Sequence, residues 1–145
     1  MDSIDAKTGM IVLEEDECWR LIREADVGRI AVAINGRPDI FPINHTVDGQ
    51  TVVFRSQAGT KLAAAVLGKA VAFEVDGYDP WTGDAWSVVV KGQAVELETL
   101  EELLHAEELP LFPWAAFPKP RVVAIIPDEV TGRRFHVLSD RQPAS

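Results

Sequence analysis

Two short turn signals limit the fold class of this chain. Asn35-Gly36 separates an apolar, β-branched segment from a second extended segment, and Asp48-Gly49 separates the second from a third. Asn-Gly between apolar runs is the strongest short-range indication of a β-hairpin, because both residues tolerate the positive φ angles of a tight turn. Three segments joined in this way form an antiparallel meander. We therefore expect a mainly β protein.

The other elements follow from periodicity and from helix-end signals. Apolar residues at Cys18, Leu21, Ile22 and Ala25 have helical spacing and predict an amphipathic helix that begins near residue 14. A glycine inside the longest apolar strand, Gly92, predicts a bulge or a barrel corner. Two further helices are predicted: one covers 61–67 and is ended by Gly68, and the other covers 99–108 and begins with a capping box at Thr99. The predicted strands are 28–34, 39–47, 51–56, 70–75, 86–95, 121–126 and 133–138, and a turn at 127–132 joins the last two.

About seven strands with a few short helices, evenly spaced turns and no strand–helix alternation favour a closed or split antiparallel β-barrel. The 145 residues fit a single domain, 1–145. We expect an ordered core of about residues 10–140, with tails before about residue 9 and after residue 140.

Composition excludes several classes of partner. The 14 basic and 23 acidic residues give a net charge of −9, which repels a nucleic-acid backbone. No apolar run approaches the roughly 20 residues that span a bilayer, and the N-terminus has no export-signal pattern, so we expect a cytoplasmic protein. Cys18 is the single cysteine, and the three histidines lack metal-ligand spacing, so we expect no metal site.

An anion-binding arrangement is predicted where the third strand meets the second helix. Thr60 is a candidate N-cap and Lys61 the first helical residue, so unpaired backbone N–H groups and an ammonium would point at the same place. Arg55, on the departing strand, can add a forked set of donors. The alternative is that these are surface cations that solvate a loop. We expect the set to hold a phosphate group.

Six segments, taken together and in order, resemble the pyridoxamine 5′-phosphate oxidase-related flavoproteins. The resemblance runs from about Glu14 to Phe135. The segments are Val27-Gly28-Arg29-Ile30-Ala31, the stretch from Gly36 to Asn44, Phe54-Arg55-Ser56 with Gly59-Thr60-Lys61-Leu62, Phe73-Glu74-Val75-Asp76, Trp86-Ser87-Val88 and Gly132-Arg133-Arg134-Phe135.

The resemblance implies an FMN-binding split barrel, a homodimer with two flavin sites at the subunit interface. It places Arg55 and Lys61 on the FMN phosphate, Gly59 and Thr60 at the phosphate turn, and Ser56 near the ring or ribityl chain. Further cofactor-binding positions are implied at the ring edge (Pro42, Ile43, Asn44), from the partner subunit (Trp86, Ser87) and at the outer end of the pocket (Arg133 with Phe135).

Any chemistry is expected to come from the cofactor, because no catalytic triad, carboxylate pair or Walker-type loop is visible. Catalytic residues are left unassigned. The resemblance stops short of the extra basic and aromatic residues that hold the phosphate of vitamin B6, so we expect a flavin-dependent oxidoreductase that acts on another small molecule. The alternatives are a deazaflavin cofactor, a flavin or haem binder without turnover, with His45 as candidate axial ligand, and a scaffold that acts through its dimer surface.

Overall fold

The computed structural model describes residues 3–56, 61–109 and 121–137 of the chain. The part described is mostly strand, with three helices. Its elements, in chain order, are β1 (Ser3–Ile4), β2 (Ile11–Val12), α1 (Glu15–Glu24), β3 (Val27–Ile34), β4 (Arg37–Asp48), β5 (Thr51–Ser56), α2 (Lys61–Val66), β6 (Ala70–Tyr78), β7 (Asp84–Glu96), α3 (Leu100–Glu107) and β8 (Arg121–His136).

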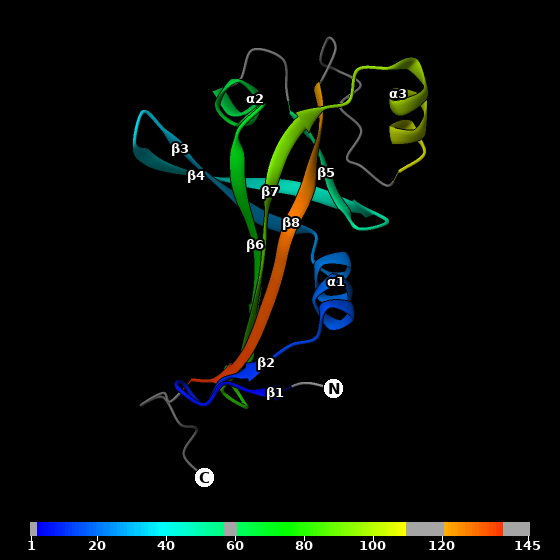
Figure 1. The fold of residues 1–145 in the computed structure, drawn as a ribbon. Helices are drawn as coiled ribbons and strands as arrows, with labels where there is room; N and C mark the ends of the chain where they lie inside the picture. The colour runs from blue at the N-terminus through cyan, green and yellow to red at the C-terminus, as the bar shows by residue number, and fades with distance from the viewer. Residues whose placement is uncertain (1–2, 57–60, 110–120, 138–145) are drawn as a thin grey trace.

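The strands form an antiparallel sheet that closes on itself. Pairing runs in the order β8-β5-β4-β3-β6-β7, and β7 pairs again with β8 to complete the barrel. The first part of β8 pairs with β5, whereas its last part pairs with β2, so β1 and β2 extend the sheet beyond the closed region. Figure 1 shows the long strands β6, β7 and β8 running from α2 and α3 to this extension. The predicted split antiparallel barrel is confirmed.

The turn chemistry works as the sequence indicates. Ile34 pairs with Arg37 across the first hairpin, and both residues between them, Asn35 and Gly36, have positive φ angles of 52° and 76°. The next two-residue turn lies between Asp48 and Thr51. Strands β3, β4 and β5 are therefore neighbours in sequence order, and the predicted meander is confirmed.

One strand prediction is wrong. Residues 121–136 form the single strand β8, not two strands with a turn at 127–132. Opposite Gly92 the register shifts: Gly92 faces Pro127 but Lys91 faces Glu129, which leaves Asp128 as an extra residue. A β-bulge of this kind accommodates a proline inside a strand, because the ladder is already interrupted there. The bulge predicted from Gly92 is confirmed.

The N-terminal segment also differs from the expected tail. Ser3–Ile4 pairs with Ile11–Val12, and the latter pairs with Arg133 and Arg134 on β8. The β8 residues that pair with Ile11–Val12 are far away in sequence, so local patterns cannot indicate the pairing. A two-residue strand also leaves no periodic pattern to recognise. The expected tail after residue 140 lies outside the described residues.

The predicted helices are all present, and each covers a different part of the barrel. One face of α1 enters the core, and α2 contributes to the same core from near β3. Helix α3 begins at Thr99 with the predicted capping box and packs over β5 and β8 on the other side of the sheet. The largest fully buried side chains are Trp19, Phe54, Phe73, Ile22, Ile30, Ile125, Val52, Val53, Val66, Val75, Val88 and Val90.

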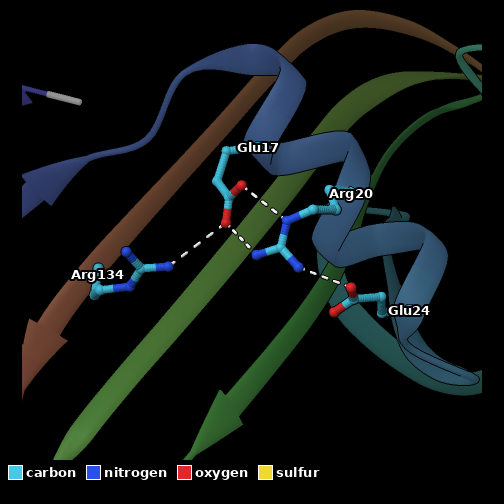
Figure 2. A network of polar contacts seen from close by, with 4 residues as sticks. All are labelled: Glu17, Arg20, Glu24 and Arg134. Atoms are coloured by element: carbon cyan, nitrogen blue, oxygen red, sulfur yellow. Dashed lines mark hydrogen bonds and ion pairs between the residues drawn. The ribbon is translucent and has the colours of Figure 1, made fainter. Parts of the chain in front are cut away.

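Exposed charges join α1 to β8. Glu17 accepts hydrogen bonds from Arg20 and lies 3.6 Å from Arg134 of β8, while Arg20 also contacts Glu24 (Figure 2). The guanidinium of Arg20 is the main cause of the lowered pKa of Glu17. Because these side chains are solvated, the network adds little stability, and the buried apolar face of α1 is what fixes the helix.

Gly92 is the position where the barrel tolerates a side chain least. A Cβ atom there would lie 2.0 Å from the backbone carbonyl oxygen of Ile126, which cannot move without breaking the β7–β8 ladder. We expect Gly92→Ala to lower the free energy of unfolding by about 3 kcal/mol in urea titrations. The matched variant Gln93→Ala changes an exposed neighbour and should stay within about 0.5 kcal/mol of wild type. Equal stabilities for the two variants would contradict the bulge packing.

Candidate functional site

The outward side chains of β4, β3, β6, β7 and β8 form one surface, here called the outer face. Alternation defines it along β3, β6 and β7, where buried residues recur at every second position, and strand pairing extends it to β4 and β8. Strand register arranges its side chains in rows. The first row is Pro42, Arg29, Glu74, Val89 and Thr131, the second is Asp76, Ser87 and Arg133, and the third is Tyr78, Ala85 and Phe135.

The predicted phosphate residues lie at the end of β5. Arg55 is half-buried and shares the outward side of its strand with Val53, whereas Ser56 is buried at 2% exposure. Lys61 is exposed and starts α2. Gly59 and Thr60 lie outside the described residues. The chain length between Ser56 and Lys61 allows a separation of at most about 18 Å.

The predicted ring-edge residues of β4 divide between the two sides of the sheet. Pro42 and Asn44 are exposed on the outer face, but the side chain of Ile43 is buried in the core. His45 pairs with Phe54 in antiparallel strands. The next residue of each strand, Asn44 on β4 and Arg55 on β5, is therefore opposite the other. The β4 residues and the candidate phosphate residue therefore lie close together.

Of the two residues implied for the partner subunit, Ser87 lies farther along the outer face, whereas Trp86 packs against the core on the opposite side of β7. Ser87 and Arg133 face each other on β7 and β8. Trp86 is half-buried and its ring lies across Gly77, since a Cβ on Gly77 would be 2.5 Å from the indole Nε1. Three strand spacings separate Asn44 from Ser87, or about 14 Å. The outward-facing predicted residues thus form two groups on the outer face, whereas Ile43, Ser56 and Trp86 belong to the inward side of their strands.

A charged cluster fills the space between these groups. Arg29 contacts Glu74 and Asp76, with 2.5 Å between its Nη2 and an oxygen of each carboxylate. Burial is the main cause of the raised pKa of Glu74, and a hydrogen bond to Asp76 adds to it. All three residues belong to segments recognised in the sequence but were given no role. The available signal was the presence of Arg29, Glu74 and Asp76 as isolated charges within otherwise apolar strands.

A groove opens beside this cluster at the far end of β6, β7 and β8. Its volume is about 570 Å³. The third row crosses it, so Ala85, at 4% exposure, lies between Tyr78 and Phe135. The lining residues are Glu74, Asp76, Gly77, Tyr78, Ala85, Trp86, Ser87, Phe135 and Val137.

A smaller hollow of about 280 Å³ adjoins the groove. Ser87 lines both spaces, and the side of the hollow toward β8 carries Arg133. The predicted pair Ser87 and Arg133 therefore lies beside cavities.

His45, the candidate axial ligand, is a core residue. Its Nε2 lies 2.9 Å from the carbonyl oxygen of Ile22, in the last turn of α1, and its ring meets Phe73 edge-on at 4.8 Å between centroids. Donation from Nε2 satisfies a helix-end carbonyl, which has no partner within the helix. Burial lowers the pKa of His45, which favours the neutral form of the ring. These contacts give His45 a structural role.

The family model described as pyridoxamine 5′-phosphate oxidase matches residues 14–134. The chain belongs to this family. It is 37% identical to Rv0080, an uncharacterized protein of Mycobacterium tuberculosis, over 92% of this chain and 90% of the other.

Two solved structures share this fold and more than 30% of its sequence. The FAD binding protein from Mycobacterium smegmatis superposes with a TM-score of 0.81 at 38% identity, covering 86% of this chain and 98% of that one. A conserved protein of unknown function from Corynebacterium diphtheriae gives a TM-score of 0.75 at 33% identity, covering 87% and 98%.

No helix among the described residues is long and apolar enough to cross a membrane. Within the same ranges, no three His, Cys, Asp or Glu side chains are grouped so as to hold a metal ion.

Buried His45 makes stability depend on pH. In the unfolded chain a histidine titrates near its ordinary pKa of 6.5, whereas the folded protein resists protonation. The contribution of His45 to the free energy of unfolding is therefore fully present above pH 6.5. It is lost as the pH falls below that value, by up to about 1.4 kcal/mol per pH unit. His45→Gln keeps a donor for Ile22 and cannot titrate, so urea titrations from pH 8 to 5 should show a shallower decline. Parallel curves for variant and wild type would rule out this role.

Proposed function

We propose that the protein is a homodimeric flavin-dependent oxidoreductase whose cofactor lies on the outer face, between subunits. The similarity to an FAD binding protein over nearly the whole of both chains carries the flavin assignment. When bound, a flavin accepts and returns a pair of electrons as hydride, chemistry that the protein side chains do not supply.

The charges on the outer face favour one orientation of the cofactor. Arg55 and Lys61 offer a forked guanidinium and an ammonium, which suit the phosphate of a flavin nucleotide. Glu74 and Asp76, toward the groove, would repel a phosphate. We therefore place the phosphate at the β5 end and the ring over Pro42 and Asn44.

Exposed apolar residues on the same face support a dimer. Val27 and Ile40 are 50% and 61% exposed on β3 and β4, on either side of the Pro42 row. Apolar side chains grouped on an open sheet face are typical of protein–protein contacts. A partner seated there would bring its own Ser87 and Arg133 toward the cofactor, which accounts for the separation of the two groups within one chain.

FMN is the cofactor predicted from the sequence, and FAD and a deazaflavin are the alternatives. The phosphate residues serve all three, so the ring and the nucleotide must be identified directly. A haem-binding role is disfavoured by His45, whose Nε2 is already engaged with the carbonyl of Ile22.

The cofactor assignment has a direct test. We expect the purified protein to be yellow and to release, on denaturation, a flavin identified by its absorption spectrum and mass. Replacing both Arg55 and Lys61 by Ala should weaken flavin binding by about 100-fold or more in fluorescence titrations, because two charge-assisted contacts to phosphate are lost.

The matched control is the double variant Lys7→Ala and Arg37→Ala, which removes one exposed lysine and one exposed arginine elsewhere. It should bind flavin like wild type. Equal affinity of both double variants would contradict the phosphate assignment, and a protein that binds no flavin at micromolar concentration would contradict the proposed function.

A further inference from the structure

We infer that the groove at the far end of β6, β7 and β8 binds a planar, positively charged heteroaromatic compound. We also infer that this compound is the substrate of the oxidoreductase, and this part of the inference rests on the proposed function. The binding itself rests on the shape and charge of the groove alone.

The shape of the groove suits a flat ring. Tyr78 and Phe135 stand on β6 and β8 with Ala85 between them on β7, in one register row. The two aromatic residues are two strand spacings apart, about 10 Å at the backbone, and the residue between them ends at Cβ. One planar ring can occupy such a slot and stack on either side chain. Tyr78 is 51% exposed, so the slot can be reached from solvent.

The charge of the groove selects a cation. The ionisable acids that line it are Glu74 and Asp76. Arg29 contacts both but is a single positive charge against two carboxylates, so the lining of the groove carries an excess negative charge. The next cation in the row of Asp76 and Ser87, Arg133, lines the adjoining hollow. Asp76 is the more exposed of the two, with 49% of its side chain open to solvent, so it can meet a ligand while Glu74 holds Arg29.

The aromatic rings and the carboxylates of the groove both favour a positively charged ligand. Aromatic faces attract cations, and a carboxylate beside them strengthens the preference. An anionic group placed beside Asp76 would be repelled, so the wall formed by the two carboxylates disfavours an anionic ring.

Three flat probes of similar size and different charge test the inference by calorimetric titration of the protein as purified, at pH 8. They are N-methylquinolinium as the cation, quinoline as the neutral compound and 1-naphthoate as the anion. We expect N-methylquinolinium to bind about fivefold more tightly than quinoline, and 1-naphthoate to bind most weakly.

Two variants locate the binding. Asp76→Asn should weaken N-methylquinolinium binding about fivefold and leave quinoline unchanged, whereas Asp128→Asn, which removes an exposed acid at the bulge, should change neither. Tyr78→Ala removes an exposed wall of the slot and should weaken all three probes. Circular dichroism establishes that each variant is folded.

Several results would overturn the inference. They are a preference for 1-naphthoate, an unchanged affinity for the cation in Asp76→Asn, and no binding of any probe at millimolar concentration. Flavin content, read from visible absorbance in the same samples, separates the two proposals. A flavin-free protein that still prefers the cation contradicts the oxidoreductase assignment and upholds the groove as a cation site.

Discussion

The close approach of β7 and β8 at Gly92 is the contact on which the architecture depends. Only a hydrogen atom fits between this α-carbon and the carbonyl of Ile126, and the bulge that results lets two long strands bend without separating. The paired strands β7 and β8 can then close the barrel at one end and form part of the outer-face groove at the other. A straight ribbon would leave either the barrel open or the groove without its β6 wall.

Local chemistry made most of the fold predictable. The Asn35-Gly36 turn, the capping box at Thr99 and the apolar face of α1 each depend on residues a few positions apart, and each was recognisable from the sequence. The continuity of β8 was not, because Pro127 indicates a turn unless its partner strand is known. Strands β1 and β2 were missed for the same reason, since β2 depends on pairing with Arg133 and Arg134.

The candidate site was predictable as a set of residues but not as an arrangement. Alternation along each strand indicates which residues share a face. The rows that place Arg29 beside Glu74 depend on pairing between β3 and β6, which are far apart in sequence. The charged cluster between the two groups of predicted residues therefore emerged only with the register. Gly59 and Thr60 lie outside the described residues, and their role stays a prediction.

The alanine at the bottom of the slot has a consequence for how this protein could diversify. Ala85 belongs to the outward side of β7, so its methyl group sets the depth of the slot while the barrel interior is built by Val88 and Val90 on the opposite side. A bulkier residue at this one position would make the slot shallower and narrow the range of accepted compounds. Selectivity can thus change by single substitutions that leave the folding core intact.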